Sequence, residues 1–342
     1  MSVVITLIII AVLILAHEWG HFIVARRVGI PVHEFSLGFG YKLFSTNRNG
    51  VEYSLRLIPL GGFVRMSGED SDFSDPKGFS QRTPLEKIRV SFAGPFMNFV
   101  LALLIFIFTY SIIGIPSSSP QPILGKIIPD KPAAAAGLQE KDRILAVNGH
   151  NVTTWNEFTE QIGSTPAGTP MEFKVERNNN IKYINVSAEL NESTGLPVIG
   201  VLGSVIYERQ GIFEAVKIGF QQTYDLTRLM LIGLWTIITG GASAGDLAGP
   251  VGITQLVGEA AQVGSVILLT FAAFLSINLG IINLLPIPAL DGSKIVFAVV
   301  EAIRRKPMEP EKEGLIHFIG FVFLMLLIVI VTYNDIMRLI KG

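Results

Sequence analysis

The sequence contains no cysteine, and only 16% of its residues carry a charge. The lack of cysteine excludes a disulfide framework, and it means that any zinc site must be built from histidines and carboxylates. The formal net charge of -1 provides no basic surface for nucleic acid, so we exclude that class of partner. Hydrophobic residues make up 49% of the chain and its mean hydropathy is +0.50, values that indicate a membrane protein.

Long hydrophobic runs are present at four places. A helix needs about 20 apolar residues to cross a hydrocarbon core of about 30 Å. The first, second and fourth runs meet this criterion cleanly. The third run contains Asn283 and is interrupted by Pro286 and Pro288. Polar residues and prolines at the end of a spanning helix indicate a functional break. The expected transmembrane helices are residues 1–27, 88–115, 263–292 and 313–338.

Basic residues predict the orientation of these helices, because short loops rich in lysine and arginine face the cytoplasm. Such residues follow the first span, precede the second, and fill the stretch between the third and fourth. They are Arg26, Arg27, Arg82, Lys87, Arg89, Lys294, Arg304, Arg305, Lys306 and Lys312. We therefore expect both termini and the long segment between the second and third spans to be extracytoplasmic.

The segment between the first two spans, residues 31–85, is too polar to cross the membrane. Asn49-Gly50 lies between two runs of alternating polarity, which predicts a β-hairpin with a primed turn. Residues 57–64 are apolar but interrupted by proline and glycine, as is typical of an edge strand. We expect a small membrane-associated β-sheet on the cytoplasmic side.

Two further regions are expected between the second and third spans. A Pro/Ser linker at 116–120 precedes residues 121–206, whose soluble, strand-rich composition predicts a separate domain. Residues 211–262 begin with apolar positions spaced among polar ones, which predicts an amphipathic helix in the membrane interface, followed by a linker.

His17, Glu18 and His21 form a short motif with the spacing of a metalloprotease site. Residues four apart share one helix face, so both histidines can direct a ring nitrogen to one metal ion, with Glu18 beside the bound water. Zinc lowers the pKa of that water to about 7, and the glutamate accepts its proton during attack on a peptide carbonyl. A chance match is the alternative, but three ionisable residues in a membrane helix are costly without a function.

Catalytic zinc normally has three protein ligands, so the two histidines require a partner elsewhere. Asp291 is the best candidate, because a lone carboxylate at the end of an apolar run is otherwise costly. The basic residues place His21 and Asp291 at a similar depth near the cytoplasmic side. Asp291 could instead cap a helix that begins at Gly292. The acidic residues of 69–75 are more typical of a solvated loop, and the single histidine His317 is expected to be structural.

Together, these motifs resemble the site-2 protease family of intramembrane metalloproteases, most closely its bacterial branch of the regulator of sigma-E protease and its relatives. The resemblance covers nearly the whole chain through the order and spacing of residues 17–21, 38–40, 92–98, 249–253 and 283–292. It implies a Zn2+-dependent endopeptidase in the inner or plasma membrane of a bacterium. It also implies single-span transmembrane substrates, such as anti-sigma factors or signal-peptide remnants, cleaved in regulated intramembrane proteolysis.

A substrate helix must unwind before cleavage, and its exposed backbone then needs new hydrogen-bond partners. The predicted edge strand can supply them by pairing with the unwound segment. The family resemblance favours the carboxamide of Asn283 as a second contact. The expected substrate-binding residues are Leu57, Ile58, Leu60, Gly61, Gly62 and Asn283.

Residues 130–149 resemble the signature of bacterial PDZ domains, which bind extended peptide segments by adding a strand. The resemblance implies that residues 123–127 form the carboxylate-binding loop, with Leu124, Gly125 and Ile127 in the groove. Lys141 departs from the usual pattern, which has glycine at this position. A domain that only rejects substrates with a bulky outer portion is the alternative to peptide capture.

The sequence thus predicts a multi-pass α-helical membrane protein with four transmembrane helices, a small β-sheet and an extracytoplasmic PDZ domain, in contact with the lipid bilayer. A catalytically inactive membrane scaffold that binds peptides through its PDZ domain is the alternative function. A zinc transporter is disfavoured, because Glu18 has no role in transport and few other acidic groups line the helices.

Overall fold

The computed structural model describes residues 1–69, 75–191, 195–241 and 248–341. The chain divides into two compact units. The first consists of Met1–Ile112 and Gly211–Gly342, and the second of Ile113–Gln210. Among the described residues, four helices are long and apolar enough to cross a membrane, as expected from the sequence. They are Ser2–Arg27, Pro84–Ile113, Ser265–Leu284 and Glu311–Ile340.

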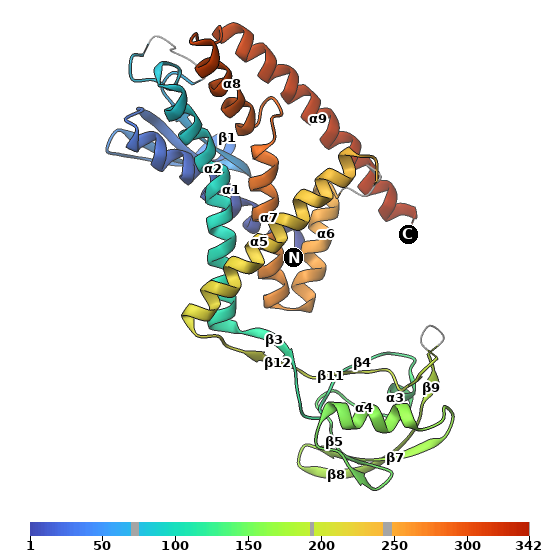
Figure 1. Cartoon of the computed structure of the whole chain (residues 1–342). Helices are drawn as coiled ribbons and strands as arrows, with labels where there is room; N and C mark the ends of the chain where they lie inside the picture. Colours follow the sequence, from blue (N-terminus) through green and yellow to red (C-terminus); the bar gives the residue numbers. More distant parts are fainter. Residues whose placement is uncertain (70–74, 192–194, 242–247, 342) are drawn as a thin grey trace. The chain divides into compact units, whose positions relative to one another are not determined.

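In the first unit, α1 (Ser2–Arg27), α2 (Pro84–Phe108) and α7 (Ser265–Leu284) pack together (Figure 1). The side chain of Thr83 accepts a hydrogen bond from the amide of Glu86, and the Glu86 carboxylate accepts one from the amide of Thr83. This capping box starts α2 four residues before the predicted span. Beyond Phe108, α2 continues as a short π-helix, η2 (Thr109–Ile113).

Small residues allow these helices to approach closely. A Cβ atom on Gly20 of α1 would lie 2.2 Å from the carbonyl oxygen of Ala93 on α2. A Cβ atom on Gly280 of α7 would lie 3.0 Å from the carbonyl oxygen of Pro95. Close contact between backbones is a usual basis of helix association in membranes, where the hydrophobic effect does not drive one helix onto another.

The predicted third span, residues 263–292, is not a single helix. Helix α7 ends at Leu284, and α8 (Asp291–Arg304) begins after a six-residue loop that contains both prolines. Proline lacks the amide proton that a helix interior needs, so the helix stops at this loop. Asp291 is the first residue of α8 and Leu290 is its N-cap, so the alternative in which Asp291 caps a helix from Gly292 is wrong.

The region 211–262 contains two helices, α5 (Ile212–Ile238) and α6 (Pro250–Val263). Helix α5 is amphipathic, as predicted, and packs on α2 and α7. The second helix replaces part of the expected linker. Val257 of α6 is buried and clusters with Leu13 of α1 and Leu275 of α7. Tertiary packing therefore stabilises α6.

Helix α9 (Pro310–Lys341) completes the first unit. The C-terminal part of α9 packs against α6. The carboxylate of Asp335 accepts hydrogen bonds from the amides of Gly249 and Gly252, at 3.2 and 2.8 Å. These amides lie at the N-terminal end of α6, where an anion is favourable. Asp335 is 3% exposed, so this contact is internal.

Residues 31–85 form the predicted hairpin, with strands β1 (Val32–Arg48) and β2 (Val51–Met66) that are longer than expected. Asn49 and Gly50 both have positive φ, 53° and 77°, which is the backbone of a type I′ turn. Residues 57–64 belong to β2. The hairpin packs on α1 through a cluster that includes Phe22 and Phe35.

The carboxylate of Glu34 is buried in the hairpin, with 1% of the residue exposed. It accepts hydrogen bonds from Ser54 at 2.7 Å and from Arg56 at 2.6 Å, and it pairs with Arg65 at 3.0 Å. Burial alone opposes ionisation, but the hydrogen bonds from Arg56 and Ser54 outweigh it and lower the pKa of Glu34 below its ordinary value. This ionised network ties the two strands together.

The second unit has a four-stranded sheet in the order β6-β5-β7-β8, with helix α4 (Trp155–Ser164) packed on it. Phe158 of α4 contacts Phe173 of β7 in the core. The sheet strands are β5 (Arg143–Val147), β6 (His150–Asn151), β7 (Pro170–Arg177) and β8 (Asn180–Ser187). The remaining elements are α3 (Pro132–Ala135) and three strand pairs, β3 (Ile115–Ser118) with β12 (Val205–Glu208), β4 (Leu124–Ile127) with β11 (Val201–Gly203), and β9 (Glu189–Leu190) with β10 (Pro197–Val198). The expected Pro/Ser linker is thus partly a strand.

Lys141 adopts the backbone conformation that glycine favours, with φ of 71°. Its neighbour Asp142 is fully buried and accepts two hydrogen bonds from Arg177, both at 2.7 Å. We expect Lys141→Gly to stabilise this turn by about 0.5–1 kcal/mol, because glycine adopts positive φ without steric cost. Slower hydrogen exchange of residues 138–144 would report the gain. Lys141→Ala keeps a Cβ atom and should not slow exchange; equal effects of the two substitutions would contradict the prediction.

Candidate metal centre

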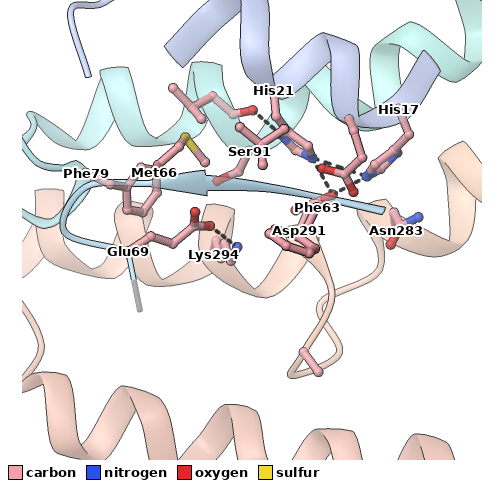
Figure 2. Close-up of a pocket in the computed structure, with 14 residues that line it drawn as sticks. His17, His21, Phe63, Met66, Glu69, Phe79, Ser91, Asn283, Asp291 and Lys294 are labelled. Atoms are coloured by element: carbon pink, nitrogen blue, oxygen red, sulfur yellow. Dashed lines mark hydrogen bonds and ion pairs between the residues drawn. The ribbon is translucent and has the colours of Figure 1, made fainter. Parts of the chain in front are cut away.

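Helix α1 places His17 and His21 one turn apart on one face, and the start of α8 brings Asp291 to them. The Nε2 atoms of His17 and His21 are 3.2 Å apart, and they lie 3.0 and 3.2 Å from Oδ2 of Asp291. Figure 2 shows both imidazole rings turned toward Asp291. Among the described residues, these three form the one group of histidines and carboxylates found close enough to share a metal ion.

The donor set fits zinc. A tetrahedral zinc ion with bonds of about 2.0–2.1 Å holds its ligand atoms about 3.3 Å apart. The three measured separations, 3.0 to 3.2 Å, are close to that value. Two imidazoles and one carboxylate also match the three protein ligands of catalytic zinc sites, which keep a fourth position open.

The hydrogen bond on the far side of His21 selects its tautomer. Nδ1 of His21 lies 2.8 Å from the carbonyl oxygen of Val90 on α2. A carbonyl oxygen can only accept, so Nδ1 carries the proton and donates it. The lone pair is then on Nε2, the atom that faces Asp291, and the ring is fixed in the orientation that a metal ligand needs.

Gly94 of α2 lies directly against this ring. A Cβ atom on Gly94 would be 2.2 Å from Nε2 of His21. The ring cannot move aside without losing its bond to Val90, so we expect Gly94→Ala to weaken zinc binding at least about tenfold. Zinc affinity of the purified protein, measured by competition with a chromogenic chelator, checks this.

Gly233→Ala is the matched control for the glycine substitution. Gly233 lies in helix α5, and in the described part of the chain no heavy atom beyond the adjacent residues and helix backbone lies within 4 Å of a Cβ placed on it. Zinc affinity should be unchanged, and the helix should gain up to about 1 kcal/mol from the better helix former. Wild-type zinc affinity in Gly94→Ala would show that the ring has room to move.

A cavity of about 280 Å³ opens beside His17, His21 and Asp291. Glu18 and Asn283 both line it, as the sequence analysis predicts for a base and a substrate contact. The amide nitrogen of Asn283 donates a hydrogen bond to the carbonyl oxygen of Leu279, at 3.0 Å. The complete lining is His17, Glu18, His21, Phe63, Val64, Met66, Glu69, Phe79, Val90, Ser91, Asn283, Ala289, Asp291 and Lys294.

Strand β2 passes next to Glu18. A Cβ atom on Gly62 would lie 3.3 Å from Cγ of Glu18 and 2.8 Å from the carbonyl oxygen of Ser36. The cavity lining includes Phe63, Val64 and Met66 of β2 rather than Gly62, Leu57, Ile58 or Gly61. Leu57 and Ile58 are exposed further along β2, and Gly61 packs on the ring of Phe39. Leu60 also lies in β2.

Several cavity residues escaped the sequence analysis. Glu69, which we assigned to a solvated loop, lines the cavity and pairs with Lys294 of α8 at 2.5 Å. Ser91 of α2 also lines it and is 2% exposed. Lys294 carries a usable signal, because it lies three residues after Asp291 and so shares its helix face. The acidic run gave no comparable signal for Glu69.

His317 of α9 contacts the loop before Asp291 and is not one of the three clustered ligands. Its Nδ1 accepts a hydrogen bond from the amide of Ala289, at 3.0 Å, and Ala289 has a φ of 75°. Gly320, one turn further along α9, leaves room for Pro288, since a Cβ there would lie 2.3 Å from that ring. Helix α9 thus supports the conformation of the loop that delivers the carboxylate.

In the second unit, the expected groove residues lie on β4. Both edges of this strand have backbone partners at Leu124. The amide and carbonyl of Leu124 bond to Asp142 and Lys141, both at 2.8 Å, and the opposite edge pairs with β11. The side chain of Leu124 is fully buried. Gly203 of β11 lies next to Trp155 of α4. Among the described strands, this pairing leaves β11 with one unpaired edge.

Comparison with known proteins identifies the family. The chain is 34% identical to the regulator of sigma-W protease RasP of Bacillus subtilis and 34% identical to the zinc metalloprotease RasP of Geobacillus kaustophilus. It covers 99% of the first and 98% of the second, with 99% and 98% of this chain aligned. The PDZ domain of an SdrC-like protein from Listeria monocytogenes matches 26% of this chain and 93% of its own, with 19% identity and a TM-score of 0.23. The profile of peptidase family M50 matches residues 5–327. The chain belongs to peptidase family M50, the site-2 protease family that its motifs resemble.

Proposed function

We propose that this membrane zinc metalloendopeptidase cleaves single-span transmembrane proteins, with His17, His21 and Asp291 as zinc ligands and Glu18 as general base. The observation that carries the proposal is the convergence of three ligand atoms within 3.2 Å of one another, beside a cavity that Glu18 lines. The helices that supply the histidines and the cavity wall are apolar enough to span a membrane.

The bound zinc supplies Lewis acidity and lowers the pKa of water to about 7. Glu18 accepts the proton of the attacking water and then donates it to the leaving amine nitrogen. His21 is held in its ligating tautomer by Val90. Gly62 of β2 lies close to Glu18, so the base is next to the strand that we expect to hold the substrate.

The substrate segment is bound in extended form. An unwound helix exposes amides and carbonyls that cannot find water in the membrane core. Strand β2 near Gly62 offers backbone groups for pairing, and Asn283 offers a carboxamide on another side of the cavity. Ser91 lines the cavity, and its buried hydroxyl has no hydrogen-bond partner among the described residues, which supports a further contact with the substrate backbone.

The relatives and the charge pattern support a bacterial plasma or inner membrane location, with both termini and the second unit extracytoplasmic. Only 11% of the most apolar stretch of α9 is buried inside the structure, which supports contact with lipid. The name of the Bacillus subtilis relative supports anti-sigma factors as one substrate class, beside signal-peptide remnants. The second unit acts as a PDZ domain that captures extended segments along β11 or excludes substrates with bulky outer portions.

Coexpression with a panel of single-span membrane proteins tests the proposal. Full-length substrates should disappear with the wild-type enzyme and accumulate with Glu18→Gln. A peptide-binding scaffold without catalysis predicts the same full-length amounts with both chains. Cleavage that continues in Glu18→Gln would contradict the assignment of the base.

A further inference from the structure

Two buried side-chain polar atoms in the described residues have no hydrogen-bond partner, Oγ of Ser91 and Oδ1 of Asn98. Both residues lie on α2, and Asn98 is fully buried. An unpaired amide oxygen in the interior costs about 1–3 kcal/mol, so its position calls for a physical reason. The other end of the same amide contacts a histidine of the proposed metal site, because Nδ2 lies 3.2 Å from Nδ1 of His17.

The ligand role of His17 determines which atom must face Asn98. The Nε2 atom of His17 faces Asp291 and His21, so it must offer a lone pair to the metal. The proton of the neutral ring is then on Nδ1, which becomes a donor. An amide NH2 group is also a donor, so it cannot pair with Nδ1–H. Rotation of the Asn98 amide by 180° exchanges Nδ2 for Oδ1 and converts the clash of donors into a hydrogen bond.

We infer that Asn98 is a positioning residue whose Oδ1 accepts a hydrogen bond from Nδ1–H of His17 and so holds this ligand in its zinc-binding tautomer. The inference rests on the proposed zinc site. Helix α2 then orients both histidines, His21 through the carbonyl of Val90 and His17 through the side chain of Asn98.

Helix α7 fixes the position of Asn98. The hydroxyl of Ser276 donates a hydrogen bond to the backbone carbonyl of Asn98, at 2.8 Å, and Ser276 is fully buried. A Cβ atom on Gly280 of α7 would lie 3.4 Å from Cβ of Asn98, an ordinary packing contact. The side chain is therefore held between α1 and α7 and cannot withdraw from His17 at low cost. Outer residues of this kind are worth 10–100-fold in metal affinity.

Three variants of the full chain test the role of the amide oxygen. Asn98→Leu keeps the branched shape of the side chain but removes the acceptor, and we expect its zinc affinity to fall about 10–100-fold in chelator competition. Asn98→Asp keeps an acceptor oxygen and removes the donor, so its affinity should stay within about threefold of the wild type or increase. Thr109→Val is the control, since Thr109 is a buried polar residue of η2 that bonds to its own helix at Ile105.

Activity provides a second readout. Excess zinc should restore the kcat of Asn98→Leu, because the variant loses metal rather than fold. Wild-type zinc affinity in Asn98→Leu would overturn the inference. If that variant does not fold, Asn98→Asp decides, because loss of zinc from a folded Asn98→Asp protein would show that Asn98 acts as a donor. Absence of a stoichiometric zinc ion from the wild-type protein would instead refute the proposed metal site.

Discussion

Glu18→Gln is expected to lower kcat for a transmembrane substrate by about 10²–10⁴-fold, the usual contribution of a general base. Glutamine preserves the size of the side chain but cannot accept the proton of the attacking water. The cavity and the three ligands stay in place, so KM and a zinc content of about one ion per chain should not change. Cleavage of a fluorescent single-span substrate in proteoliposomes measures kcat and KM, and elemental analysis measures zinc.

Glu214→Gln is the control for loss of a glutamate. Glu214 lies on α5, where its side chain is 50% exposed and pairs with Lys217 at 3.3 Å. An exposed pair of this kind contributes little to stability, so activity and folding should match the wild type. A kcat for Glu18→Gln above one tenth of the wild-type value would assign the base to another group.

Local patterns in the sequence identified the three residues that the structure brings together. His17 and His21 are four residues apart on an apolar run, and this spacing alone determines that they share a helix face. Asp291 was predicted because an isolated carboxylate next to an apolar run is costly. The structure brings the three together, although Asp291 starts a separate helix.

Residues that act through packing between distant segments gave weaker signals. The carbonyl of Val90 and the side chain of Asn98 contact the histidines only because α2 packs against α1. Gly94 matters because His21 lies on it, a contact that no local pattern encodes. Helix α6 was missed for the same reason, since its buried face depends on α1 and α7.

The pairing of strands in the second unit could not be predicted from local sequence patterns either. The pattern around Leu124 identifies a strand, but which of its edges is open depends on pairing with residues that are far away in the sequence. Leu124 is bonded to the turn at Lys141 and Asp142, and β4 is paired on its other side with β11. Alternation of residue types determines which side chains are buried and leaves the strand order undetermined.

Asp291→Asn is expected to reduce zinc affinity by more than about 100-fold, because removal of a direct ligand should exceed the loss from an outer residue. Asparagine keeps the shape of the side chain but lacks the charge that binds zinc strongly. If Asp291 only stabilised the start of α8, asparagine would cost little, since helix N-termini accept it. Chelator competition and thermal unfolding of the purified chain separate these outcomes.

Asp335→Asn is the control for Asp291→Asn, because we expect it to affect stability rather than zinc binding. Asp335 is a buried carboxylate that accepts hydrogen bonds from two amides at the start of α6 and has no role among the metal ligands. Its replacement should lower the unfolding temperature and leave zinc affinity unchanged, whereas Asp291→Asn should lose zinc from a protein that still folds. Loss of both properties in both variants would mean that the carboxylates act only through stability. Opposite effects would assign the metal to Asp291, because stability alone cannot separate two buried acids in this way.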